Sequence, residues 1–198
     1  MAVSYSDTPV RPVGGRLVLD FLNTADWSEA CEVIDEKLTY PSDVTKWTDA
    51  LGISRAVTDG RAHDLDTLRH LRTELRDIFL SVVKGSAPEP SSVHRVNDLL
   101  KSMTNRAELI RFSKQPWLVI ESQLIDAILT SAKAVLIDPR EISRVRMCSG
   151  PDCGWMYLDE SRNQSRKWCM MQTCGNRAKA RRFYANKTSE SWAKRTKT

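Results

Sequence analysis

Apolar residues recur at helical spacing through much of the first 139 residues. The clearest run lies between residues 64 and 84, where apolar side chains mostly fall three or four positions apart and charged residues fill the opposite face. Shorter runs of the same kind predict helices over residues 17–24, 42–51, 91–103 and 122–137. We expect Ser42 to cap the second of these helices and one of the two serines at 91–92 to cap the third.

Two stretches depart from the helical pattern. Residues 107–112 and 117–121 are short apolar runs separated by Ser-Lys-Gln-Pro, which is typical of a β-hairpin. Residues 25–40 show no clear period, and we expect them to be irregular. The chain up to residue 139 is therefore predicted to be a helical domain with a small β-hairpin, so the protein is α+β in class and mainly α.

The composition changes after Pro139. Apolar periodicity fades there and Cys, Gly, Arg and Trp become frequent, so we place a domain boundary between a first domain, 1–139, and a second, 140–198. Residues 140–198 carry 14 Lys and Arg against 5 Asp and Glu, a net charge of +9, whereas residues 1–139 carry −4. A short basic segment favours a polyanionic partner, most commonly nucleic acid, although a solvated face would show the same charge.

Four of the five cysteines lie close together in this basic segment. Cys148 and Cys153 are separated by four residues, fifteen residues follow, and Cys169 and Cys174 are again separated by four. Two such pairs suit one tetrahedral Zn²⁺ ion, and four thiolates leave no open position for a catalytic water, so the site is predicted to be structural. A pair of disulfides or a redox thiol switch is the rival interpretation, and the absence of a secretory signal argues against disulfides.

The residues around the cysteines predict the form of the zinc module. Glycines directly follow Cys153 and Cys174, where a residue without a Cβ can take a positive φ and turn backbone N–H groups toward the sulfurs. Residues 155–158 have the character of a strand, residues 159–166 that of a turn, and residues 176–185 that of a helix whose N-terminus would face the negative site. A knuckle, a hairpin and a helix in this order form a treble-clef-like four-cysteine zinc finger, here followed by a basic tail.

The motifs of residues 145–187 carry a family resemblance. They are Cys148-x4-Cys153-Gly-Trp, Asp159-x-Ser161-Arg162-x3-Arg166-x-Trp168-Cys169, and Cys174-Gly175-Asn176-Arg177 with Lys179 and Arg182. Together they look like the CGNR zinc finger. Its usual companion is an N-terminal domain called ABATE, whose opening motif residues 17–24 resemble. The resemblance implies a stress-induced bacterial transcription regulator whose finger is proposed to bind DNA, and it implies no ligand for the N-terminal domain.

The helix after Cys174 and the turn before it supply the candidate nucleic-acid contacts. Basic side chains on a narrow helix can read bases in a major groove or lie along phosphates. The candidates are Arg162, Arg166, Lys167, Arg177, Lys179, Arg181 and Arg182. Two alternatives to DNA stay open. One is RNA or another polyanion, and the other is an adaptor whose zinc module is a protein-docking or oligomerisation surface, with Arg177 neutralising the thiolates or paired with Asp159.

Catalysis and membrane insertion find little support in the sequence. We expect no enzyme, because no paired ionisable groups, phosphate-binding loop or nucleophile elbow stands in the chain. No apolar run is long enough to span a bilayer, so we expect no membrane partner and a cytoplasmic location. A homodimer stays open as an assembly, and any small-molecule ligand of the N-terminal domain is undefined.

A few isolated polar residues complete the set of candidates. His63, His70 and His94 are interpreted as surface residues, because no acidic or Cys partner stands at ligand spacing. Asp20 and Asn23 interrupt an apolar stretch, and we expect each to act as a cap or to make a local backbone hydrogen bond, with one wall of a small-molecule pocket as the alternative. The sequence assigns no role to the fifth cysteine, Cys31.

Overall fold

The computed structural model of the chain describes residues 11–28, 32–53, 64–104, 108–111, 117–120, 124–150 and 153–195. The α-helices within these ranges are α1 (Leu17–Leu22), α2 (Pro41–Ala50), α4 (Leu65–Lys84), α5 (Pro90–Thr104), α6 (Leu124–Ile137), α7 (Pro139–Ile142) and α8 (Asn176–Arg195). The strands are β1 (Ala25–Trp27), β2 (Val33–Glu36), β3 (Glu108–Arg111), β4 (Trp117–Ile120), β5 (Val145–Met147) and β6 (Met156–Leu158). They pair antiparallel in chain order, β1 with β2, β3 with β4 and β5 with β6.

The predicted fold class is confirmed. The described chain is mainly helical with small antiparallel hairpins, and β3 and β4 form the hairpin expected over residues 107–122. The clearest helical run is α4, which begins where the Asp64 carboxylate accepts a hydrogen bond from the backbone N–H of Asp66. It ends at Gly85, whose φ of +65° is left-handed and favours glycine.

The predicted serine caps are wrong. Helix α2 begins at Pro41, so Ser42 lies inside its first turn, and the Asp43 carboxylate accepts the two backbone N–H groups just before the helix. Helix α5 begins at Pro90, which places both candidate serines inside its first turn as well. Proline has a fixed helical φ and no N–H to satisfy, so it is well suited to start a helix.

The prediction that residues 25–40 are irregular is also wrong, because they contain β1 and β2. Arg72 of α4 is almost fully buried and donates hydrogen bonds to the Thr24 carbonyl oxygen, over 3.0 Å, and to the Glu36 carboxylate. Buried Lys37 pairs with Asp26 over 3.1 Å. Charged contacts with a distant helix thus order a segment whose own sequence has no period.

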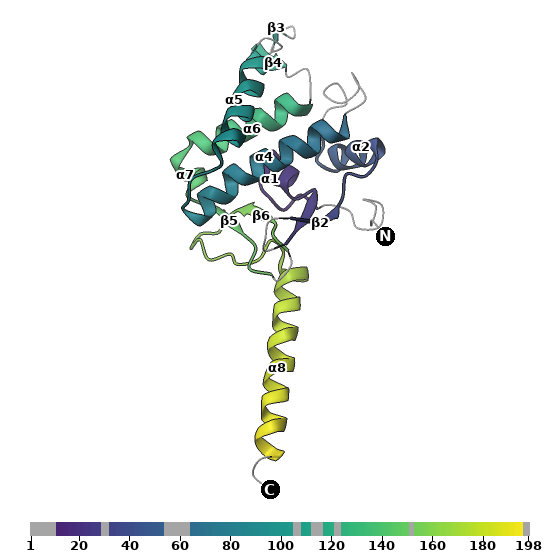
Figure 1. Cartoon of the computed structure of the whole chain (residues 1–198), viewed down its shortest axis with the longest axis vertical. Coiled ribbons are helices and arrows are strands. Elements are labelled where there is room, and N and C mark those ends of the chain that lie inside the picture. Colours follow the sequence, from purple (N-terminus) through teal and green to yellow (C-terminus); the bar gives the residue numbers. More distant parts are fainter. Residues whose placement is uncertain are drawn as a thin grey trace.

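Helix α1 lies at the centre of the hydrophobic core. Val18, Leu19, Phe21 and Leu22 are fully buried, and α1 contacts α4, α6 and β6. Figure 1 shows this short helix surrounded by the longer ones. A helix that is apolar on nearly every side must be enclosed in this way, which explains the dense apolar run at its position in the sequence.

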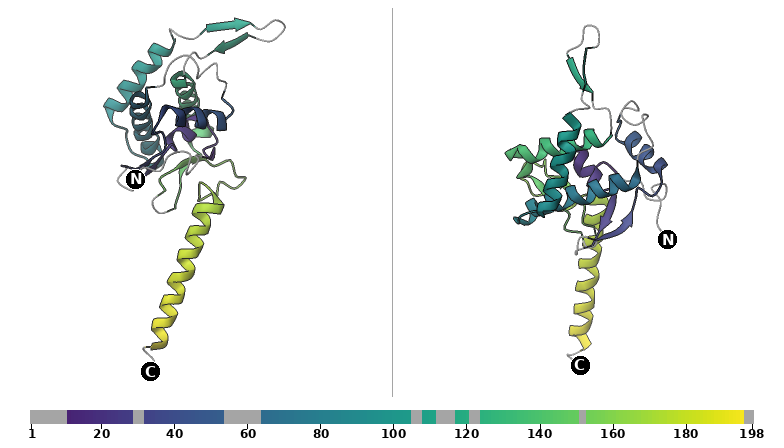
Figure 2. Two further views of the ribbon diagram at one scale, coloured as in Figure 1. Left: turned by 90° about the vertical axis from the view of Figure 1, so that its right-hand side faces the viewer. Right: turned by 45° about the horizontal axis from the view of Figure 1, so that its top comes forward.

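The hairpin of β5 and β6 belongs to the same core. Val145, Met156 and Leu158 are buried among the side chains of the helical part, and β5 contacts α4. The change in composition after residue 139 is therefore not a break in the packing. From the hairpin the chain continues into α8, which projects away from the other helices at the end opposite β3 and β4 (Figures 1 and 2).

Candidate metal centre and the helix that leaves it

Four cysteine thiols meet beside the β5–β6 hairpin. Cys148 follows β5, Cys153 precedes β6, Cys169 follows the next turn, and Cys174 lies in η1 (Met171–Gly175), a single π-helical turn that leads into α8. All four residues are buried, and their sulfur atoms lie within 4.8 Å of one another. The fold thus brings together the four residues that the sequence predicts as metal ligands.

The geometry of this cluster fits a zinc ion. The Sγ of Cys169 lies 3.6 Å from the Sγ of Cys153 and 3.6 Å from that of Cys174. Zn–S bonds of about 2.3 Å in a tetrahedron place sulfurs about 3.8 Å apart, so the thiols need little movement to close around the metal. Within the described ranges no second group of three or more Cys, His, Asp or Glu side chains offers comparable ligand atoms.

Backbone N–H groups point at one of the sulfurs. The N–H groups of Gly150 and Cys169 lie 3.3 Å and 3.2 Å from the Sγ of Cys148 and donate hydrogen bonds to it. Such bonds partly offset the charge of a thiolate. The glycines after Cys153 and Cys174 were expected to turn backbone N–H groups toward the sulfurs. At Cys148 the tight turn at Gly150 has this role.

Those two glycines have different roles. Gly154 has a φ of +62°, as expected, and an added Cβ would lie 2.7 Å from the Cβ of Trp27. Gly175 does not have a positive φ, so that part of the prediction is wrong. An added Cβ there would collide with the side chain of Met171 and lie 3.2 Å from the Cδ1 of Trp168. Gly154 is needed for contact with the helical part, and Gly175 for space at the start of α8.

Crowding separates the pKa values of the thiols. Hydrogen bonds from Cys153 and Cys169, helped by the backbone N–H groups of Cys169 and Gly150, lower the pKa of Cys148 to about 2. Hydrogen bonding to Cys148 and Cys153, together with burial, raises the pKa of the Cys169 thiol well above its ordinary value. Because four thiolates cannot share this buried space without a cation, metal binding must displace protons from the cluster.

Arg166 lies within the finger. Its guanidinium stands 4.1 Å over the Tyr157 ring and donates hydrogen bonds to the carbonyl oxygens of Val13, over 3.1 Å, and Trp168, over 3.0 Å. The Tyr157 hydroxyl donates to the Arg166 carbonyl oxygen over 2.6 Å. A guanidinium held in this way is poorly placed to contact phosphate. We therefore revise its predicted role, since its contacts hold the loop that carries Cys169.

Asp159 closes the turn between β6 and Cys169. Its carboxylate accepts hydrogen bonds from the N–H and hydroxyl of Ser161, over 3.0 and 2.6 Å, and from the N–H of Arg166, over 3.0 Å. Burial opposes ionisation here, but these bonds outweigh it and keep the pKa of Asp159 below its ordinary value. The carboxylate thus shapes the turn itself, and the hydrogen bonds described here go to Ser161 and Arg166 and not to Arg177, the alternative partner.

The other candidate nucleic-acid residues are exposed. Two of them lie in the loops before η1, and four lie along the first two turns of α8; they are Arg162, Lys167, Arg177, Lys179, Arg181 and Arg182. The helix runs to Arg195, ten residues beyond its predicted end, and carries seven Lys and Arg residues against one acidic residue. In Figure 1 it stands clear of the rest of the chain.

Buried hydrogen bonds tie the finger to the helical part. The Nδ2 of Asn23 donates to the Met156 carbonyl oxygen, and its Oδ1 accepts from the Met156 N–H, each over 2.8 Å. Asn23 is the C-cap residue of α1, as expected, but its side chain bonds to this distant strand and not locally. Asp20 does bond locally, to the Gly14 N–H over 2.8 Å, and the Gly14 carbonyl in turn accepts the Leu158 N–H over 2.8 Å.

Strand β1 makes a second connection, which no pattern in the sequence predicts. The indole Nε1 of Trp155 donates to the Asp26 carboxylate over 2.8 Å. The next residue, Trp27, packs against Gly154, and the guanidinium of Arg76 from α4 lies 4.2 Å over its ring. The two residues that follow the first ligand pair are therefore held directly against the helical part.

The remaining sequence candidates lie away from the cluster or outside the described ranges. His70 and His94 are exposed, the first 2.7 Å from the Asp66 carbonyl oxygen and the second 3.2 Å from the Asp98 carboxylate. Cys31 and His63 lie outside the described residues. In the described part of the chain, every helix is too short or too polar to cross a membrane.

Comparison with known families matches both parts of the chain. Residues 15–139 match the ABATE family model, whose description is "Putative stress-induced transcription regulator", and residues 144–187 match the model of the CGNR zinc finger. No curated protein matches the chain. The four cysteines lie within the second match, and the hydrogen bonds between Asn23 and Met156 join the two matched regions.

Proposed function

The chain belongs to the ABATE family and ends in a CGNR zinc finger, and from this premise we propose that it regulates transcription by binding duplex DNA through α8. The observation that supports the proposal most is the helix itself. It starts at the metal centre, projects from the molecule and carries a large excess of basic side chains (Figure 1).

The dimensions of α8 suit a major groove. An α-helix with its side chains is about 10–12 Å across, and the major groove of B-DNA is about 12 Å wide. Arg177, Lys179, Arg181 and Arg182 are exposed on different sides of the helix. Some can therefore reach base edges while others contact the phosphates of either strand, with Arg162 and Lys167 adding phosphate contacts beside the finger.

A projecting helix of this kind is stabilised when it binds a partner. Among the described elements, α8 packs mainly on η1, so most of its length has no protein surface to cover it. Helices that lack such packing are marginal in water, because fixing the backbone of each residue costs entropy. DNA binding would supply the missing contacts, so we expect the helical content of α8 to rise when duplex is bound.

We propose that one structural Zn²⁺ ion holds the base of this helix. Cys148, Cys153, Cys169 and Cys174 would be its ligands, and the tetrahedral set would leave no position for substrate or water. Cys174 lies in η1 directly before α8. The metal would therefore fix the position of the first turn of the helix and take no part in a reaction.

The helical part would serve as the sensing or assembling half of the regulator. We propose no catalytic activity for it, and a cytoplasmic location follows from a DNA partner. Its contact with the finger through Asn23, Gly14 and Trp155 provides a route by which a change in the helical part can reach α8. Whether the chain activates or represses depends on where its DNA site lies.

The test is an unbiased selection of duplex DNA by the full chain, run with and without a zinc chelator. We expect enrichment of one family of sequences with the metal present and none after chelation. If no duplex binds even at low salt, the proposal fails. If chelation leaves the enriched sequences unchanged, the metal does not support the DNA-binding helix.

One observation favours a second candidate, an adaptor in which α8 docks on protein. Phe183 and Tyr184 are 64% and 66% exposed and lie with ring centroids 5.7 Å apart. Neighbouring exposed aromatic side chains are common at protein interfaces. Light scattering of the full chain tests this candidate: a homodimer that Phe183→Ala with Tyr184→Ala converts to monomer, in a protein that binds no duplex, would support it over DNA binding.

A further inference from the structure

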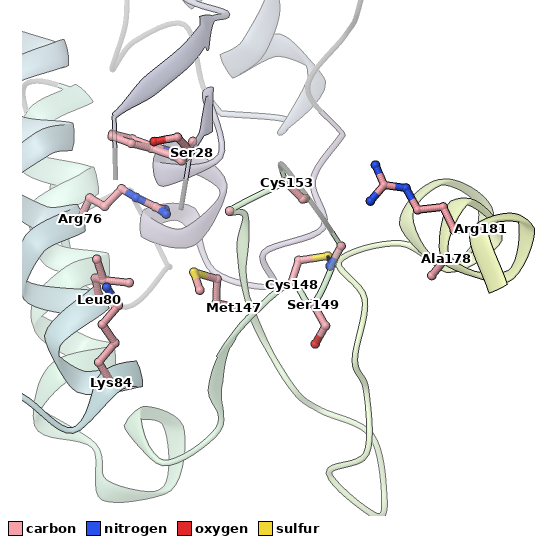
Figure 3. A pocket seen from close by; sticks show the side chains of 13 residues that line it. Ser28, Arg76, Leu80, Lys84, Met147, Cys148, Ser149, Cys153, Ala178 and Arg181 are labelled. Carbon is pink, nitrogen blue, oxygen red and sulfur yellow. Dashed lines mark hydrogen bonds between the residues drawn. The ribbon is translucent and has the colours of Figure 1, made fainter. Parts of the chain in front are cut away.

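A cavity of about 470 Å³ lies where the helical part, the finger and α8 meet (Figure 3). Helix α4 lines one side, the loop that carries the first ligand pair lines another, and the first turns of α8 line a third. Cavities of several hundred cubic ångströms hold small organic molecules, and they occur preferentially where two domains meet. This cavity is therefore placed to connect the two halves of the protein.

The lining combines positive charge with apolar surface. Arg76, Lys84 and Arg181 supply three cations, and none of the lining residues that the structure describes is acidic. Trp27 and Leu80 supply buried apolar surface beside them. The guanidinium of Arg76 stacks on the Trp27 ring, and both side chains are almost fully buried, so this wall has a fixed shape.

The metal centre forms part of the cavity wall beside these cations. Zinc with four thiolates carries a net charge of about −2, and two of its ligands, Cys148 and Cys153, line the cavity. Figure 3 shows the side chains of Arg76 and Arg181 extending toward the cavity from opposite sides, one from α4 and one from α8.

We propose that this cavity binds a small organic anion, with a carboxylate, sulfonate or phosphate group among the cations and an apolar body against Trp27 and Leu80. The buried apolar wall distinguishes this ligand from a phosphate of the DNA backbone, which has no apolar part to place there. In a second step, which rests on the proposed function, the bound anion engages Arg181 and thereby withdraws one DNA-contacting side chain. Occupancy then weakens DNA binding.

The site can be tested without DNA. The probe is 8-anilinonaphthalene-1-sulfonate, an aromatic anion whose fluorescence rises in apolar surroundings, and its neutral partner is N-phenyl-1-naphthylamine, which lacks the sulfonate. Both are titrated into the full-length, metal-loaded protein. We expect one saturable site for the anionic probe and binding of the neutral probe that is at least tenfold weaker.

Three variants localise the site. Leu80→Trp should fill the cavity and abolish binding of the anionic probe, with metal content and near-ultraviolet circular dichroism as checks of the fold. Lys84→Ala, at an exposed position that needs no repacking, should weaken the anionic probe about three- to tenfold and leave the neutral probe unchanged. Lys101→Ala, which removes the same charge from α5, is the matched control and should change neither.

The outcomes separate the site from the proposed function. Probe binding that survives Leu80→Trp and Lys84→Ala, or equal binding of the two probes, overturns the site. Displacement of the probe by a short duplex, together with loss of duplex binding in Leu80→Trp, also overturns it, because the cavity would then hold DNA phosphate. If probe binding behaves as expected and no duplex binds, the site stands and only the DNA function fails.

If the anion site and the DNA function are both confirmed, the anionic probe should lower the affinity for duplex in the wild type and have no such effect in Leu80→Trp. An unchanged affinity in the wild type at saturating probe would overturn the second step and leave the site itself standing.

Discussion

Asn23 and Met156 are joined by two hydrogen bonds of 2.8 Å, one in each direction. The carboxamide at the end of α1 takes the place of a neighbouring strand and satisfies both backbone groups of Met156 in β6. Both residues are fully buried. The contact joins the region that matches the ABATE family to the region that matches the zinc finger, so we expect the two parts to fold as one unit.

Asn23→Asp should therefore be costly. The change keeps the size of the side chain but replaces the Nδ2 donor by an acceptor that faces the Met156 carbonyl oxygen, and burial leaves both without water. We expect the free energy of unfolding to fall by about 2–4 kcal/mol. Urea denaturation followed by circular dichroism measures it, with exposed Asn97→Asp as a control that should stay within about 0.5 kcal/mol of the wild type.

Metal removal should destabilise the helical part together with the finger. Met156 and Leu158 follow the first ligand pair by a few residues and are buried in the common core. We expect one thermal transition, with a midpoint that falls on chelation. Cys169→Ser should abolish binding of the proposed zinc ion, whereas Cys31→Ser should leave it bound. A helical part that keeps its midpoint without metal would show that the two parts fold independently.

Arg166 and Arg162 offer a matched pair that separates scaffold from DNA contact. Arg166→Ala removes the stacking on Tyr157 and the bonds to carbonyl oxygens of two loops, so we expect a loss of about 2 kcal/mol in unfolding free energy. Arg162 is exposed, and Arg162→Ala should leave stability within about 0.5 kcal/mol. Only Arg162→Ala should weaken DNA binding without destabilising the chain. If Arg166→Ala weakened DNA binding without destabilising the chain, Arg166 would again be interpreted as a phosphate contact.

The sequence predicts the parts of this molecule that depend on local chemistry. The period of apolar residues defines α4, and the spacing of the cysteines defines a cluster whose sulfurs lie close enough for one metal. What it misses depends on distant partners. Strands β1 and β2 are ordered by Arg72 of α4, and Asn23 pairs with a residue 133 positions away. The polar residues Asp20 and Asn23 in an apolar run indicate that buried hydrogen-bond partners exist, but they do not identify these partners.

Asp20 should make stability depend on pH. Burial disfavours its charged form and raises its pKa to about 6, although the backbone N–H groups of Gly14 and Val13 and the charge of Arg166 act in the other direction. Because this pKa lies above the unfolded value of about 4, the folded state holds the extra proton between about pH 4 and 6. Stability from this group is present at low pH and is lost as the pH rises through that window.

Asp20→Asn removes the titration and keeps an acceptor for the Gly14 N–H. The unfolding free energy of the variant minus that of the wild type should therefore rise by up to about 3 kcal/mol as the pH increases from 4 to 7. Urea denaturation of both proteins at several pH values measures the difference. A difference that does not change with pH would show that Asp20 titrates alike in the folded and unfolded states.

The basic residues of α8 should contribute to DNA binding by counterion release. Arg177, Lys179 and Arg182 are exposed, and replacing each by Gln removes one charge while keeping a residue that favours helix. A residue that contacts phosphate should lower the slope of log affinity against log salt by about 0.9, whatever the sequence of the duplex. A residue that reads a base should instead change which sequence is preferred. Lys133→Gln, at an exposed position of α6, removes the same charge at a distance and should leave the slope unchanged. If all four variants behave alike, the attraction comes from the net charge of the protein, and α8 is not the surface that meets DNA.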